Sequence, residues 1–174
     1  ESPGDVFNSH ILGVAGLIKL LLGELTPQED AILDEALIQT YAIKDITPDT
    51  DFSNLPPPVL SDLQSILEGM TGAESMATRL KKFTQGTFAG FLNQPTNVPL
   101  NNQLIVFGIR DMEEELRPVA MYLVLNYVWT QIRRDLRKRI LVVDEAWWLM
   151  KYPVGADFLF NIAKRGRKYY VGLT

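Results

Sequence analysis

The feature that most constrains the fold is a short apolar run that ends in two carboxylates, within the segment RILVVDEAWWLM at residues 139–150. The aliphatic residues from Ile140 to Val143 lead without alternation into Asp144 and Glu145. A short, non-alternating apolar run predicts a strand that is covered on both faces, as in a parallel sheet. Ligands of such sheets bind beyond the carboxyl ends of the strands, which is where Asp144 and Glu145 would lie.

The two carboxylates have the chemistry of a Walker B element. An Asp at the end of the strand helps to hold the Mg²⁺ that bridges nucleotide phosphates, and the neighbouring Glu can orient and activate the attacking water. The structural alternative is a buried strand that ends in two solvated acids. Because the pattern alone occurs in many unrelated chains, the flanking sequence has to distinguish the two interpretations.

Composition argues against several kinds of chemistry. The 174 residues include no cysteine and a single histidine, His10. Disulfides, thiolate metal sites and catalysis by Ser–His or Cys–His pairs are therefore not expected. No uninterrupted apolar run reaches the roughly 18–20 residues that span a bilayer, so the sequence predicts no transmembrane segment.

The charge is unevenly distributed along the chain. Residues 1–87 carry 5 Lys/Arg against 13 Asp/Glu, a net charge of −8, and residues 88–174 carry 12 against 8, a net charge of +4. Two clusters, RRDLRKR at 133–139 and KRGRK at 164–168, hold most of the basic charge. Such clusters suit an anionic ligand or nucleic acid, but they equally suit helix C-termini, where cations stabilise the helix dipole.

Hydrophobic periodicity divides the chain near residue 96 into a mainly helical segment, 1–96, and an α/β segment, 97–174. In the first, Thr26, Pro27 and Glu29 form a capping box that predicts the start of a helix. In the second, strands are predicted at 103–107, 140–143 and 169–173, with helices from the 113–118 region to about 137 and at 155–167. This order predicts right-handed crossovers and three parallel strands.

The sequence does not contain GxxxxGK[ST], the loop whose amides hold phosphate in P-loop enzymes. If the Walker B interpretation is correct, we expect the phosphate loop to lie upstream of Glu1 and the chain to be a fragment of a larger protein.

Several segments together resemble one family, the large ATPase of bacterial type IV secretion and conjugative transfer systems, of the VirB-four or TraC type. Between Gly86 and Thr174 the matching segments are GTFAGFLNQPTNV (86–98), LIVFGIRD (104–111), LRPVAMY (116–122), VVDEAW (142–147) and RGRKY (165–169). In the helical part the matching segments are LTPQE (25–29) and ALIQTY (36–41). Asp-Glu-Ala-Trp is the most specific of these, because a tryptophan at this place is unusual among P-loop ATPases.

The resemblance implies a partial RecA-like P-loop NTPase core, residues 97–174, with residues 1–96 as an all-α insertion. It implies ATP and Mg²⁺ as cofactors, with Asp144 as a Mg²⁺ ligand and Glu145 as the catalytic carboxylate. It also implies a ring, expected to be a hexamer, on the cytoplasmic face of the inner membrane. The implied partners are other inner-membrane subunits of the secretion system, with DNA as a further candidate.

Arg165 and Arg167 are additional catalytic candidates. In ring ATPases an arginine near a subunit boundary can stabilise the phosphoryl transition state of the neighbouring subunit. The alternative is that these cations only neutralise a helix end.

Three other functions compete with a secretion ATPase. A DNA-translocating motor of the FtsK/HerA group would use the basic clusters to follow a nucleic-acid backbone. A non-enzymatic fragment would dock onto partner proteins through its helices. A phospho-receiver module needs a second acceptor Asp at the end of a later strand, and the only Asp after Glu145 is Asp157, which lies in a helical pattern.

Overall fold

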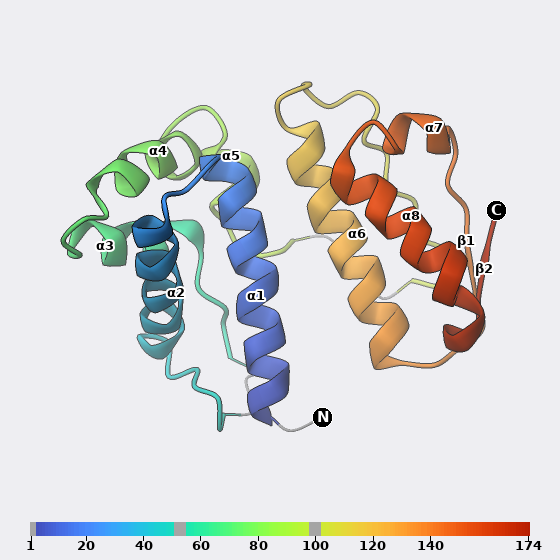
Figure 1. The fold of residues 1–174 in the computed structure, drawn as a ribbon, viewed down its shortest axis with the longest axis horizontal. Helices are drawn as coiled ribbons and strands as arrows, with labels where there is room; N and C mark the ends of the chain where they lie inside the picture. The colour runs from blue at the N-terminus through green and yellow to red at the C-terminus, as the bar shows by residue number, and fades with distance from the viewer. Residues whose placement is uncertain (1–2, 51–54, 98–101) are drawn as a thin grey trace. The chain divides into compact units, whose positions relative to one another are not determined.

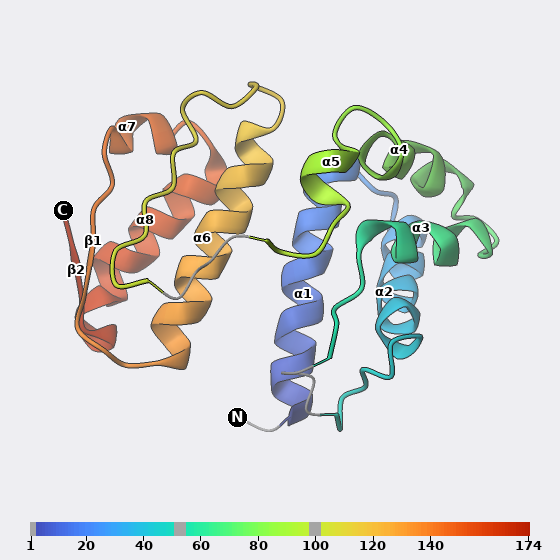
Figure 2. The ribbon, with the colours of Figure 1, turned by 180° about the vertical axis from the view of Figure 1, so that it is seen from behind.

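A computed structural model describes residues 3–50, 55–97 and 102–174. The chain divides into two compact units, Glu1–Gln103 and Leu104–Thr174, so the division falls several residues after the predicted position. Figures 1 and 2 show the two units from opposite sides.

The first unit is helical. Its described helices are α1 (Pro3–Leu22), α2 (Pro27–Ala42), α3 (Leu60–Glu68), α4 (Glu74–Thr84) and α5 (Ala89–Leu92). The predicted capping box begins α2: the Glu29 amide donates to Thr26 Oγ1 at 3.2 Å, and the Thr26 amide donates to Glu29 Oε2 at 2.9 Å. This reciprocal pair satisfies two amide groups that the first turn of a helix leaves without partners.

One arginine joins three helical segments of this unit. The Arg79 guanidinium, on α4, donates to the carbonyl oxygen of Leu22 at 2.8 Å and to that of Glu24 at 3.2 Å. It also forms an ion pair with Glu29, 2.6 Å between Nη2 and Oε1. Arg79 therefore links α4 to the C-terminus of α1 and to the first turn of α2.

Helix α1 is longer than the longest uninterrupted apolar run in the sequence. Residues Gly4–Leu22 form one continuous helix that is long and apolar enough to cross a membrane by length and composition alone. Polar residues such as Lys19 interrupt the apolar run along this helix, and an average of the hydropathy over its length tolerates them. The stripe Phe7, Ile11, Ile18 and Leu22 is buried within the unit, and α1 packs against α2 and α4.

The second unit places helices on one side of a small sheet. Its described elements are α6 (Arg117–Arg134), β1 (Arg139–Leu141), α7 (Ala146–Leu149), α8 (Pro153–Arg165), the 3₁₀ helix η1 (Gly166–Tyr169) and β2 (Val171–Leu173). Within this unit, α6 and α8 run toward one end and both strands run back toward the other (Figure 1). After the strand predicted at 103–107, the predicted order of helices and strands is present, with the short α7 in addition.

The two strands are parallel, with Arg139 opposite Val171 and Leu141 opposite Leu173. Pairing continues past the strands, since the Thr174 amide donates to the Leu141 carbonyl at 3.0 Å and the Val143 amide to the Thr174 carbonyl at 2.9 Å. The α/β class is thus observed as a small parallel sheet in a chain that is otherwise mainly helical.

The strand predicted at residues 103–107 does not form in the described structure, so this prediction is wrong. Leu104 and Val106 are exposed while Ile105 and Phe107 are half-buried, so the alternation of a strand is present. Phe107 lies edge-on to Tyr127, with ring centroids 6.2 Å apart. The segment nevertheless pairs with no other strand among the described residues, and a strand is defined by its hydrogen-bonded partner.

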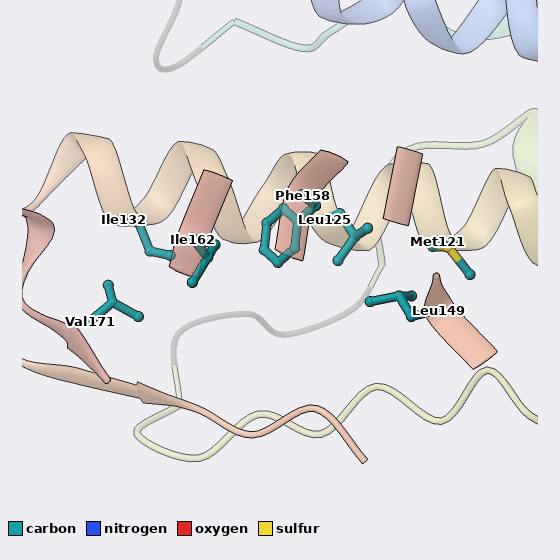
Figure 3. Packing of buried hydrophobic residues seen from close by; sticks show 7 residues of the cluster. All are labelled: Met121, Leu125, Ile132, Leu149, Phe158, Ile162 and Val171. Atoms are coloured by element: carbon teal, nitrogen blue, oxygen red, sulfur yellow. The ribbon is translucent and has the colours of Figure 1, made fainter. Parts of the chain in front are cut away.

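The core of this unit lies between the helices and one face of the sheet (Figure 3). Its buried members come from α6, α7, α8 and β2, and they are Met121, Leu125, Ile132, Leu149, Phe158, Ile162 and Val171. Leu141 and Val143 pack against this cluster from the β1 side. Removing apolar surface from water stabilises a fold by about 25 cal/mol per Å², so this cluster is the main stabilising element of the unit.

The opposite face of β1 corrects the expectation that the strand is covered on both sides. Ile140 is 80% exposed and Val142 is 69% exposed. Successive side chains of a strand point to opposite faces, so the aliphatic run supplies a core face through Leu141 and Val143 and an open face through the other two. None of the described residues covers that open face.

Gly155 allows α7 and α8 to pack closely. A Cβ atom at this position would lie 2.3 Å from the carbonyl oxygen of Leu149 and 2.9 Å from its Cγ. No side chain fits there, so glycine sets the sharp path from α7 into α8 and places the segment after Glu145 against the core.

Candidate Walker B site

Asp144 and Glu145 lie where the sequence predicted, just beyond the carboxyl ends of both strands. The last sheet hydrogen bond joins Val143 to Thr174, and the two acidic residues form the turn that follows. Both side chains are exposed. This is the edge of a parallel sheet at which ligands bind.

The backbone of the acidic turn is unusual. Glu145 has φ 52° and ψ 45°, the left-handed conformation, and it is the N-cap residue of α7. Asp144 Oδ1 accepts a hydrogen bond from the Glu145 amide at 2.9 Å, and the Glu145 carbonyl accepts one from the Trp148 amide at 2.8 Å. Left-handed backbone costs a non-glycine residue roughly 1–2 kcal/mol, and strain of this kind gathers at functional sites.

Two tryptophans follow the acids on α7, and a cation lies near the ring of each. Trp148 lies edge-on to Tyr152 with centroids 5.5 Å apart, and the Arg117 guanidinium carbon is 6.0 Å from the Trp148 ring centroid. Exposed Trp147 has the Lys151 ammonium 4.8 Å from its ring centroid. Arg117 begins α6, far from Glu145 in sequence, so no local spacing could have placed it here.

The chemistry of the acidic pair fits Mg²⁺ only as a nucleotide complex. Within the described residues no group of three or more His, Cys, Asp or Glu side chains could hold a metal ion. Mg²⁺ is typically held by one or two carboxylates together with substrate phosphates and waters. Asp144 suits such a site, because its Oδ2 accepts no hydrogen bond from the described residues. The described residues do not provide a set of ligands that could hold the ion without a nucleotide.

Arg165 and Arg167 are not brought together with the carboxylates. Arg165 ends α8 and Arg167 lies in η1, and both precede β2. Because β1 and β2 are parallel, these arginines lie at the amino ends of the strands, whereas Asp144 and Glu145 lie at the carboxyl ends. Both arginines are exposed. An arginine of this pair therefore does not reach the carboxylates of its own unit.

The described elements define a class of protein: an all-helical unit followed by an α/β unit whose parallel strands lead into an exposed Asp-Glu pair. The chain is similar to the solved structure of VirB4 of Thermoanaerobacter pseudethanolicus, with a TM-score of 0.79 and 30% sequence identity over 95% of this chain and 48% of that chain. The chain is thus VirB4-like, which confirms the resemblance predicted from its motifs.

The match has a defined extent. The chain spans about half the length of the VirB4 chain that it matches. No family model matches the sequence, and no curated protein matches it either.

Proposed function

We propose that this chain is part of an ATP-hydrolysing motor of a type IV secretion or conjugation system, which powers substrate transfer or pilus assembly. The observation that carries the proposal is the exposed Asp144–Glu145 pair beyond the parallel strands, in a chain that is VirB4-like over 95% of its length. A Walker B element requires this placement, because its acids must meet the nucleotide at the carboxyl edge of the sheet.

The proposal assigns different roles to the two acids. Asp144 would supply an oxygen ligand to Mg²⁺ in the nucleotide complex, where the ion would offset negative charge on the phosphates. Glu145 orients and activates the attacking water as a general base. The amide of Glu145 holds Asp144 Oδ1, which fixes the aspartate against the turn and leaves the glutamate carboxylate exposed.

The α/β unit is, on this proposal, part of a RecA-like core, and the helical unit is an insertion in that core. Because GxxxxGK[ST] does not occur in these 174 residues, the phosphate loop is contributed by a part of the parent protein outside them. We therefore expect the isolated chain to lack ATPase activity.

We further propose a ring, expected to be a hexamer, on the cytoplasmic face of the inner membrane with the other subunits of the secretion system. In a head-to-tail ring the amino ends of the strands in one subunit can meet the carboxyl ends in the next. Arg165 or Arg167 then serves the neighbour's nucleotide, since neither reaches its own Asp144 and Glu145.

Magnesium dependence tests the assignment of Asp144. In the full-length protein, Asp144→Ala should reduce ATP affinity measured by calorimetry with Mg²⁺ and leave the affinity measured with excess chelator unchanged. Asp111→Ala is the matched control, an exposed aspartate outside the acidic turn, and it should behave as wild type in both conditions. Wild-type Mg·ATP affinity in Asp144→Ala would contradict the proposal.

A further inference from the structure

The end of the α/β unit opposite Asp144 carries a concentration of positive charge, which we call the basic end. Its cations come from the end of α6 with the following loop and from the end of α8 with η1, and they are Arg133, Arg134, Arg137, Lys138, Arg139, Lys164, Arg165, Arg167 and Lys168. Asp135 is the only acidic residue within segments 133–139 and 164–168, so the two segments together carry a net charge of +8.

The fold brings these two segments together. Helices α6 and α8 both end where the strands begin, at the lower end of the unit in Figure 1. Tyr170 joins the two segments through its backbone, since its carbonyl accepts from the Arg139 amide at 3.0 Å and its amide donates to the Arg167 carbonyl at 3.3 Å. Asp135 forms ion pairs with Arg137 and Arg139, so the single local acid is already used by two of the cations.

Helix dipoles do not account for this accumulation. A cation stabilises a helix C-terminus only within about the last turn. Arg133 and Arg134 occupy the last turn of α6, and Lys164 and Arg165 occupy that of α8. The remaining cations lie beyond both helices, where they add mutual repulsion without a gain from the dipole.

Tyr170 lies between the two basic segments in a strained conformation. Its φ is 57° and its ψ is 34°, and its side chain is 56% exposed. Its amide donates to the Arg167 carbonyl at 3.3 Å while its own carbonyl accepts from Arg139, so the backbone is held from both sides. A bulky residue in the left-handed region is a genuine outlier, and glycine or asparagine would hold this turn at lower cost.

We propose that the basic end binds single-stranded nucleic acid, with Tyr170 as the surface on which one base stacks and the flanking cations as phosphate contacts. Proteins that bind single strands combine a basic track with aromatic side chains in this way. An anionic membrane surface would instead favour several apolar side chains, and Leu136 is the only aliphatic residue in the two segments. The inference does not depend on ATP hydrolysis, and seven cations remain if Arg165 and Arg167 serve a subunit boundary.

Substitutions at Tyr170 separate stacking from charge. Binding of the chain to a fluorescein-labelled single strand of mixed sequence is measured by anisotropy over a series of salt concentrations. Tyr170→Asn, which tolerates the left-handed backbone, should weaken binding by about ten-fold and leave the salt dependence unchanged. Tyr170→Phe keeps the ring and should bind as wild type, and Phe91→Ala, which removes an exposed ring from the helical unit, should have no effect.

Substitutions of the cations test the phosphate contacts. The double variant Arg134→Ala/Lys138→Ala should reduce the slope of log affinity against log salt by roughly 1.4, since each phosphate contact to a single strand contributes about 0.7. Lys19→Ala/Lys81→Ala removes the same charge from the helical unit and should leave the slope unchanged. Circular dichroism verifies that each variant is folded.

Three results would overturn the inference. The first is absence of binding to the single strand at low salt. The second is equal binding by Tyr170→Asn and wild type. The third is sedimentation of the chain with phosphatidylglycerol vesicles together with a failure to bind the single strand, which would identify the basic end as a membrane-binding surface.

Discussion

The left-handed backbone at Glu145 predicts that two substitutions, which both remove the proposed catalytic carboxylate, differ in the stability of the protein. Glu145 has φ 52° and ψ 45°, and its side chain is exposed and accepts no hydrogen bond from the described residues. Replacing it therefore loses little packing. The backbone hydrogen bonds of the turn, to Asp144 Oδ1 and from Trp148, do not involve the replaced side chain.

The magnitude follows from the conformation. A non-glycine residue pays roughly 1–2 kcal/mol in the left-handed region, and asparagine is several-fold enriched there, which corresponds to about 1 kcal/mol. Glu145→Asn should therefore raise the free energy of unfolding by about 0.5–1 kcal/mol relative to Glu145→Gln. Both variants lose the same charge, so their difference isolates the backbone.

The assay is thermal unfolding followed by circular dichroism. For a chain of 150–250 residues, 1 kcal/mol shifts Tm by about 2–4 °C, so we expect Glu145→Asn to unfold about 1–4 °C above Glu145→Gln. An asparagine variant that unfolds at or below the temperature of the glutamine variant would refute the claim that this position is strained.

Two further predictions concern pH and the arginines. Burial lowers the pKa of His10 from its ordinary value of 6.5 and raises the pKa of Tyr41 from 10.0 to about 12. As pH falls through 6.5 the unfolded chain binds a proton at His10 before the folded chain does, and as pH rises through 10 it loses one from Tyr41 before the folded chain does. The stability of the helical unit, measured by urea unfolding, should therefore be highest between these two pH values. Tyr41→Phe should abolish the decline at alkaline pH. In the full-length protein, mixing Arg165→Ala or Arg167→Ala subunits with Glu145→Gln subunits should restore ATPase activity in proportion to the mixed interfaces, and single variants that each lose no more than a few-fold activity would exclude a role in trans.

Features that depend on adjacent residues were predictable from the sequence. The capping box of Thr26 and Glu29 forms as expected because both its hydrogen bonds join residues three apart. The position of Asp144 and Glu145 was also predictable, since a parallel strand delivers whatever follows it to the carboxyl edge of the sheet.

Features that depend on residues distant in the sequence were not predictable from it. Residues 103–107 have the alternation of a strand, but pairing requires a neighbour that a periodicity does not specify. The run from Ile140 to Val143 was expected to be covered on both faces, and among the described residues only one face has a cover. Sequence spacing likewise did not show that the parallel register separates Arg165 from the two acids by the length of the sheet.

ATP turnover by Glu145→Gln in the full-length protein tests the central claim most directly. The variant keeps the size of the side chain and the Asp144 contact with the backbone, and it removes only the charge that the attacking water needs. We predict wild-type affinity for Mg·ATP and loss of hydrolysis in steady-state phosphate release. Hydrolysis at the wild-type rate would contradict the assignment of Asp144 and Glu145 as the Walker B pair.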